Sequence, residues 1–408
     1  MPQAPSPVRL AIGGLLSLAA AMGIGRFVFT PILPVMVDAL PLSAGDGGYV
    51  AAANFVGYLI GALAGSLLRL PGSRRRVFLI ALGLSALTTG LMAGTESFVV
   101  FCILRFVSGI ASAYVLVGIS GLVLSRLSAL GREDLSALFF AGVGLGIAFS
   151  ALMTGGLLAL DANWQDLWVA SAFATASALV AAAILIPEEQ HATTQPQRKA
   201  QTSQSCEALA SSVPVRTSDD NSSSNAKLMR LVIAYGLFGF GYVITMTFLS
   251  LMARQDPELS GLADLLWLFV GLSAAPSIWF WNRFAARFGG ARTLALACLL
   301  EAFGVALSVS GWGMPAMVMA AFLMGGTFMG ITALGLMQAQ RLTSGDKTRI
   351  VAIMTASFGL GQVVGPWVAG VLHERSGNFT SASLAAAVAL LAAAALSLTI
   401  RRDTAAKA

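Results

Sequence analysis

The chain has 408 residues, of which 57% are apolar and only 11% are charged, with a formal net charge of +6. Soluble domains carry roughly 25% charged residues, so this composition excludes an ordinary soluble protein. Apolar stretches of roughly 20 residues, the length of a helix that crosses a ~30 Å hydrocarbon core, recur about twelve times. They predict an all-α membrane protein with about 12 transmembrane helices.

In chain order, these stretches predict spans at residues 10–37, 48–68, 77–95, 98–125, 136–160, 166–186, 228–252, 262–282, 292–311, 314–338, 350–372 and 380–400. Pro31 and Pro34 are expected to bend the outer part of the first helix, because proline removes a backbone donor.

Residues 187–227 interrupt the pattern, because they are rich in Ser, Thr, Gln and Asn and have no hydrophobic periodicity. Such a segment cannot bury enough apolar area to order itself, which predicts a disordered cytoplasmic linker. The expected domains are therefore an N-terminal six-helix bundle at 1–186, this linker, and a C-terminal six-helix bundle at 228–408.

The basic residues are divided unevenly between the two sides of the predicted bundle. The two termini and the loops after the second, fourth, sixth, eighth and tenth spans hold 21 of the 25. The opposite loops hold Arg254 and Arg375 together with nine acidic residues. Basic loops face the cytoplasm, so this asymmetry predicts a multi-pass protein of the inner (plasma) membrane with both termini cytoplasmic. Topology thus explains the positive charge, and no nucleic-acid partner is expected.

The two halves share glycine motifs at an offset of about 215 residues. Gly23-x-Gly25 in the first span is matched by Gly239-x-Gly241 in the seventh, and Gly144-x-Gly146 in the fifth by Gly359-x-Gly361 in the eleventh. Basic loops at 69–76 and 283–292 also correspond. Three matches in register predict a duplicated six-helix unit, and parallel repeats of this kind build transporters of the major facilitator type.

Four segments carry a more specific resemblance. GIGRFVFTPILPVM, AAANFVGYLIGAL, RFVSGIASAYVLV and GFGYVITMTFL resemble the YbfB/YjiJ branch of the major facilitator superfamily. The resemblance implies two pseudo-symmetric six-helix bundles around a central cavity and secondary transport by alternating access. It implies little about the substrate.

Three ionisable residues lie clearly inside predicted spans, away from the span ends: Arg26, Arg105 and Glu301. An ionisable side chain at the bilayer centre costs at least ~2.5–3.5 kcal/mol, so each is a candidate functional residue. Arg26 and Arg105 lie at similar depth, and no acidic residue of that half lies in the hydrocarbon. We expect Arg26 to bind an anionic group of the substrate, because guanidinium favours bidentate contact with carboxylates. Arg105 begins an Arg-x-x-x-Gly pattern similar to a superfamily motif that contacts the first helix, so packing is the favoured role there.

Glu301 is expected near the midplane of the ninth span. Since burial disfavours the charged form of a carboxylate, Glu301 is a candidate for proton coupling, and a structural role is the equal alternative.

Four uncharged polar residues complete the candidate substrate site. Asn54 and Tyr58 share a helix face through their i, i+4 spacing, and Gln362 and Tyr242 lie on cavity-lining spans. Each could orient a substrate, and each could instead satisfy a neighbouring helix.

Several other classes of protein are excluded. The sequence has no phosphate-binding loop, no metal-ligand cluster and no nucleophile with a plausible base, so neither enzyme activity nor a metal or cofactor is expected. The expected function is secondary transport of a small organic anion or zwitterion, with a proton as candidate coupling ion. Efflux of apolar or cationic drugs is the alternative within transport, and a membrane sensor is the alternative outside it.

Overall fold

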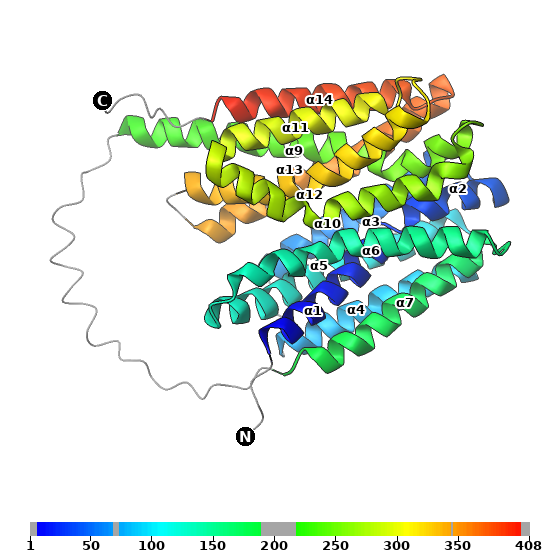
Figure 1. Cartoon of the computed structure of the whole chain (residues 1–408), viewed down its shortest axis with the longest axis horizontal. Coiled ribbons are helices and arrows are strands. Elements are labelled where there is room, and N and C mark those ends of the chain that lie inside the picture. Colours follow the sequence, from blue (N-terminus) through cyan, green and yellow to red (C-terminus); the bar gives the residue numbers. More distant parts are fainter. Residues whose placement is uncertain (1–5, 68–72, 189–217, 344–345, 401–408) are drawn as a thin grey trace.

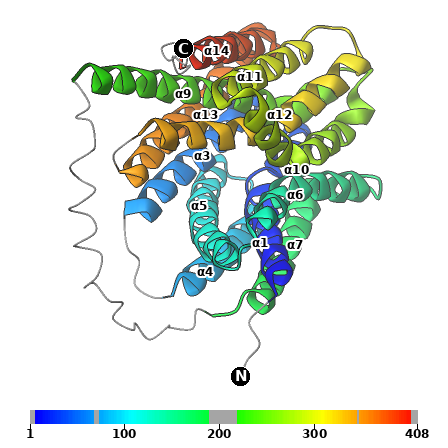
Figure 2. The same ribbon diagram turned by 60° about the vertical axis from the view of Figure 1, so that its left-hand side comes forward.

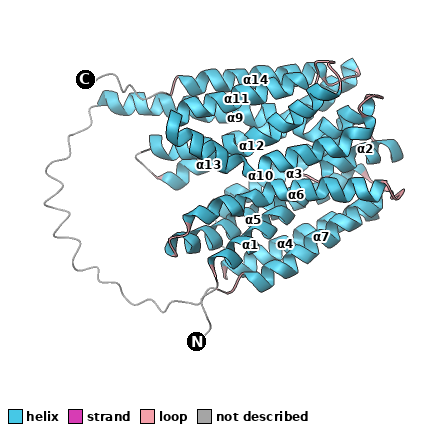
Figure 3. Cartoon of the chain, in the orientation of Figure 1, coloured by secondary structure: helices cyan, strands magenta, loops and turns pink. Residues whose placement is uncertain are grey.

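The computed structural model describes residues 6–67, 73–188, 218–343 and 346–400, and this part of the chain contains helices and no strand (Figure 3). The N-terminal helices are α1 (Pro7–Leu18), the π-helical η1 (Ala19–Ile24), α2 (Phe29–Ala39), α3 (Ala44–Leu67), α4 (Arg74–Leu91), α5 (Phe98–Ala129), α6 (Ser136–Leu158) and α7 (Trp164–Leu185). The C-terminal helices are α9 (Ser218–Gln255), α10 (Ala263–Phe288), α11 (Gly290–Leu307), α12 (Met314–Leu342), α13 (Lys347–Ser376) and α14 (Thr380–Leu398). Short 3-10 turns lie at Met92–Gly94, Glu133–Leu135 and Ser260–Leu262.

The predicted number of spans is confirmed. Within the described ranges, 11 helical segments are long and apolar enough to cross a membrane, and the bent α10 makes a twelfth. The bend of 44° in α10 lies between Ala274 and Ser277. Pro276 lies there inside the helix and explains the bend, because proline cannot donate the backbone hydrogen bond that a straight helix needs.

The first helix of the C-terminal part begins earlier than the sequence suggested. Residues 218–227, expected in the linker, form the first turns of α9, because a helix extends readily once it has formed. Residues 187–188 after α7 are non-helical. Residues 189–217, the centre of the predicted disordered segment, lie outside the described residues.

The helices form two groups, called here the N half (α1–α7) and the C half (α9–α14). In Figures 1 and 2, α11–α14 lie in the upper part of the view, α1 and α4–α7 in the lower part, and α3 and α10 between them. The main contacts between the halves are α3 with α13 and α6 with α10. We call the face where α1 begins and α14 ends the terminal face, and the opposite one the far face.

The repeated glycine motifs occupy equivalent places in the two halves. An added Cβ on Gly23 would lie 2.5 Å from Gly146 in α6, and one on Gly361 would lie 2.9 Å from Gly239 in α9. The first glycine of each later motif faces the other half: Gly144 meets α10, and Gly359 meets Leu59 of α3. The pseudo-symmetry expected from these motifs is therefore present in the packing, because each pair lets two helices approach closely.

The first span is broken, and the break precedes the prolines expected to bend it. A π-helical segment runs over Ala19–Ile24, a turn follows at residues 25–28, and α2 resumes at Phe29. Gly25 N–H donates to the Ala20 carbonyl over 2.7 Å, a bond that spans five residues. The break therefore places backbone carbonyl groups near the membrane centre, where side chains must satisfy them.

The halves are hydrogen-bonded from the membrane centre to the far face. Thr30 Oγ1 donates to the Met246 carbonyl over 2.9 Å, and Ser43 Oγ lies 3.1 Å from Glu374 Oε1. Close to these bonds, an added Cβ on Gly48 would lie only 2.5 Å from the Pro366 carbonyl oxygen. The structure is thus in a state whose far face is closed by contacts between the two halves.

Candidate functional site

Arg105 of α5 fixes the break in the first span. Its Nη1 donates to the Gly25 carbonyl over 2.8 Å and its Nη2 to the Arg26 carbonyl over 2.7 Å. Ser108 Oγ also lies 3.3 Å from the Gly25 carbonyl oxygen. Asn54 Nδ2 of α3 donates to the Arg105 carbonyl over 2.9 Å. The guanidinium thus satisfies two backbone carbonyl groups at the break and joins α5 to the first span.

Arg26 projects from the same break into the interface between the halves and is only 4% exposed. Its guanidinium carbon lies 4.0 Å from the ring centre of Tyr58 and 4.8 Å from that of Phe55. Among the described residues it forms no ion pair, and its Nε has no hydrogen-bond partner. Aromatic faces and one neutral amide therefore compensate this buried charge, which leaves it able to gain from an incoming anion.

Gln362 of α13 connects Arg26 to Tyr242 of α9. Arg26 Nη2 donates to Gln362 Oε1 over 2.8 Å, and Gln362 Nε2 donates to the Tyr242 hydroxyl. The amide orientation follows from chemistry, because a flipped Gln362 would turn its NH₂ group toward the guanidinium, which can only donate. The Tyr242 hydroxyl accepts this bond and keeps its own hydrogen for another acceptor.

Tyr242 belongs to a stack of aromatic rings in the C half. Its ring is nearly parallel to Phe328 of α12 (5°, 5.9 Å between ring centres) and to Phe358 of α13 (4°, 5.7 Å). Phe238, one turn earlier on α9, stacks at 5.0 Å. The sequence predicted a role for Tyr242 but not for Phe328 and Phe358. Aromatic residues are common in apolar helices, and the sequence does not show which of them will be in contact after folding.

A small cavity lies beside the two arginines. Arg26, Arg105 and seven further residues line it: Phe27, Phe29, Thr30, Ala51, Phe55, Met246 and Thr247. Its volume is about 10 Å³, the space for roughly one water molecule. Both arginines thus face a common central space that is nearly closed in this state.

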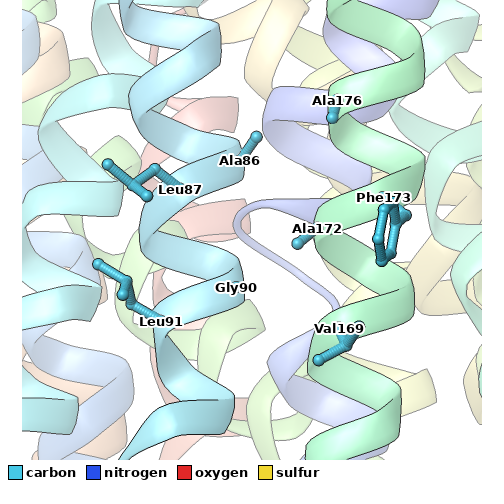
Figure 4. Close-up of a pocket in the computed structure, with 8 residues that line it drawn as sticks. All are labelled: Ala86, Leu87, Gly90, Leu91, Val169, Ala172, Phe173 and Ala176. Atoms are coloured by element: carbon cyan, nitrogen blue, oxygen red, sulfur yellow. The ribbon is translucent and has the colours of Figure 1, made fainter.

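Two larger hollows lie away from these charges. One of about 390 Å³ lies between α4 and α7 and has only apolar side chains and a glycine, as Figure 4 shows for Leu87, Leu91 and Phe173. The other, of about 490 Å³, lies among far-face loops of the C half near Asp256, Trp312 and Asn378. Neither contains Arg26, Arg105 or Glu301, so the central cavity remains the candidate site despite its small volume.

Glu301 of α11 is fully buried, and neither of its carboxylate oxygens has a hydrogen-bond partner among the described residues. The hydrogen-bonded polar groups run from Arg26 in the N half through Gln362 to Tyr242 in the C half, and Glu301 is hydrogen-bonded to none of them. A buried carboxylate without a hydrogen-bonded partner is costly in its charged form and suits a group that carries a proton.

The structure brings together most of the residues selected from the sequence. Arg26, Tyr58, Gln362 and Tyr242 form one connected group, and Asn54 lies one contact away, on the Arg105 carbonyl. Helical spacing alone could not reveal which of them touch across the two halves.

Twelve spans in two similar halves around a central charged site define a transporter of the major facilitator superfamily, a class that is not enzymatic. The sequence profile of the family described as "Uncharacterised MFS-type transporter YbfB" matches residues 18–214 and 207–398, and the chain belongs to this family. The resemblance noted in the sequence is confirmed.

Relatives of known description handle small molecules. A protein of Agrobacterium vitis described as "Putative tartrate transporter" is 25% identical over 380 residues, which cover 88% of this chain and 82% of that protein. A mutant of the nucleoside transporter NupG has a similar fold, with a TM-score of 0.75 and 17% identity over 97% of this chain and 100% of that one. The human organic anion transporter MFSD10 has a similar fold too, with a TM-score of 0.64 and 18% identity over 97% of this chain and 100% of that one. At these identities the solved structures show the fold alone.

Proposed function

We propose that this transporter moves a small organic anion and that Arg26 binds its carboxylate. The observation that carries the proposal is a buried guanidinium, at the interface of the halves, that has a neutral amide as its partner instead of an acid. A carboxylate would convert this contact into a charge-assisted pair, which is roughly twice as strong as a neutral hydrogen bond. The Tyr242 hydroxyl, with its free hydrogen, is placed to donate to the second carboxylate oxygen.

Hydroxycarboxylates are the first substrates to examine. The relative described as a tartrate transporter covers most of this chain, and the fold of MFSD10, an organic anion transporter, is similar. Arg105 adds a second positive charge on the wall of the same cavity. A compound with a carboxylate and neighbouring hydroxyl groups could bind Arg26 through the carboxylate and hydrogen-bond Gln362 and Tyr242 through its other oxygens.

We further propose that the protein lies in the inner membrane with its terminal face in the cytoplasm. The excess of basic residues on that face supports this orientation. A proton is the proposed coupling ion, with Glu301 as its carrier, because that carboxylate is fully buried and has no hydrogen-bond partner among the described residues.

The second candidate function is efflux of flat apolar or cationic compounds. The parallel rings of Tyr242, Phe328 and Phe358 favour it, because an aromatic compound could stack among them. The two cations in the central cavity oppose it for positively charged compounds.

The test compares ligand-induced stabilisation of purified wild type, Arg26→Met and Arg287→Met. Arg287 is exposed near the terminal face, so its replacement controls for the loss of one positive charge. Tartrate, lactate, succinate, a nucleoside and tetraphenylphosphonium are added to each protein. A ligand at a hundredfold excess over its Kd stabilises by about 2.7 kcal/mol. We expect carboxylates to stabilise wild type and Arg287→Met but not Arg26→Met. Equal stabilisation of all three by tetraphenylphosphonium, with none by carboxylates, would favour drug efflux.

A further inference from the structure

Gln362 is the one side chain that hydrogen-bonds Arg26 in the described part of the chain, and it comes from the opposite half. It is fully buried at the middle of α13. Both ends of its carboxamide are engaged, one by Arg26 and one by Tyr242. Gln362 is therefore part of the proposed substrate site and also part of the contact between the two halves, which must separate during the transport cycle.

We propose that the Gln362 carboxamide occupies the place of the substrate's carboxylate, and that the substrate, by displacing it, releases Arg26 from the C half. This inference rests on the proposed function, because it requires an anion that binds Arg26. Gln362 then acts as an internal substitute ligand that holds the empty transporter with its far face closed.

The match between the two groups is chemical and geometric. A carboxamide and a carboxylate are both planar and have two polar atoms on one carbon. Gln362 Oε1 accepts from Arg26, as a carboxylate oxygen would. Its Nε2 donates to Tyr242, whose hydroxyl can rotate and donate instead to a second carboxylate oxygen. An incoming carboxylate can therefore replace both contacts without moving Arg26 or Tyr242.

The lack of free space makes displacement necessary. The cavity next to Arg26 holds about 10 Å³, enough for one water but not for a carboxylate-bearing molecule. The rings of Tyr58 and Phe55 cover other sides of the guanidinium. Of these neighbours, Gln362 is the one whose contact a carboxylate improves, since it exchanges a neutral acceptor for a charged one.

Displacement would also weaken the contact between the halves. The Arg26–Gln362 bond is the innermost of the bonds that continue through Thr30–Met246 to Ser43–Glu374 at the far face. Once the anion takes Arg26, α13 loses its polar link to the first span at the membrane centre. Substrate binding would thereby favour the state of the transport cycle in which the far face is open.

The experiment uses Gln362→Ala, Gln362→Glu and the control Gln340→Ala, which removes an exposed glutamine of the C half. Tartrate affinity is measured by calorimetry. Spin labels at Leu160 and Trp312, which are 78% and 74% exposed in opposite halves, report the far-face distance in a background without Cys102, Cys206 and Cys298. Both readouts are taken with and without tartrate.

We expect Gln362→Ala to bind tartrate about tenfold more tightly, a change of ~1.4 kcal/mol, because the competing group is gone. Without ligand it should also show longer far-face distances than wild type. Gln362→Glu should lose tartrate binding and show a narrow, short distance, since a fixed carboxylate then pairs with Arg26. Gln340→Ala should match wild type in both readouts.

Two results would overturn the inference. Weaker tartrate binding by Gln362→Ala would show that Gln362 binds the substrate directly instead of competing with it. Unchanged ligand-free distances in both Gln362 variants would show that the bond does not hold the far face closed. Failure of the proposed function is distinct, because ligand binding would then not depend on Arg26. The ligand-free distances test in either case whether the Arg26–Gln362 bond holds the far face closed.

Discussion

Gly48→Ala should shift this transporter away from its far-face-closed state. Gly48 lies near the far end of α3, where an added Cβ would lie 2.5 Å from the Pro366 carbonyl oxygen and 3.5 Å from the Phe248 ring. Ordinary contacts of a Cβ atom begin near 3.4 Å. The α3 and α13 backbones must therefore separate by roughly 1 Å, since overlap with a backbone atom cannot be relieved by a rotamer change.

The size of the effect follows from this overlap. Excess volume in a well-packed interface costs about 1–3 kcal/mol. The cost falls on the state in which α3 touches α13, so the ratio of open to closed far faces should rise by about 5- to 150-fold. The distance between spin labels at Leu160 and Trp312 measures this ratio directly.

Gly156→Ala is the matched control. Gly156 lies on α6 with nothing within 4 Å of an added Cβ, so it gains the same helix propensity, about 1 kcal/mol, without a clash. It should leave the distances at their wild-type values. Identical distributions for Gly48→Ala, Gly156→Ala and wild type would refute the reasoning, because the far-face contact would then not limit opening.

Three further substitutions give independent expectations. Arg105→Met should lower the free energy of unfolding by about 3 kcal/mol, because the first span loses two hydrogen bonds from a charged donor, worth at least ~1.5 kcal/mol each. Thermal unfolding in detergent measures this loss. A change no larger than that of Arg287→Met would contradict the prediction. Glu301→Gln should abolish proton-driven tartrate uptake into proteoliposomes while tartrate exchange continues, and retained proton-driven uptake would assign coupling to another group. Asn163→Ala should cost about 1 kcal/mol, because Asn163 and Asp166 form a capping box at the start of α7; an unchanged unfolding midpoint would contradict this.

The spans and the repeat could be predicted because the bilayer restricts the solutions. Every backbone group in hydrocarbon must be satisfied, so apolar segments of spanning length become helices. Glycine pairs such as Gly144 and Gly359 could be recognised because close helix contact requires small residues in fixed register. Their partners, α10 and α3, follow from the duplication.

The break in the first span could not be predicted from its own sequence. Pro31 and Pro34 are the visible helix breakers, yet the helix deforms at residues 19–28, before both of them. The deformation depends on Arg105, which is remote in the chain and satisfies the Gly25 and Arg26 carbonyls. Local propensity contains no information about such a partner.

For the same reason, the contacts among the candidate site residues could be predicted only in part. The i, i+4 spacing placed Asn54 and Tyr58 on one face of α3, but their roles differ: Asn54 bonds the Arg105 carbonyl, and Tyr58 lies under the Arg26 guanidinium. The Arg26–Gln362 bond joins residues 336 positions apart, and only the assembled halves bring them together.

The broken first span also has a consequence for how the protein is made. The guanidinium that satisfies the Gly25 carbonyl lies 80 residues later in the chain. At translation rates of about 5–20 residues per second, it is synthesised roughly 4 to 16 s after the break. During that interval the Gly25 and Arg26 carbonyl groups lack the donors that bind them in the folded protein, and each unsatisfied backbone group in hydrocarbon costs several kcal/mol. Stable integration of the first span therefore has to wait for the fourth, which makes membrane insertion of the N half a cooperative event instead of a helix-by-helix one.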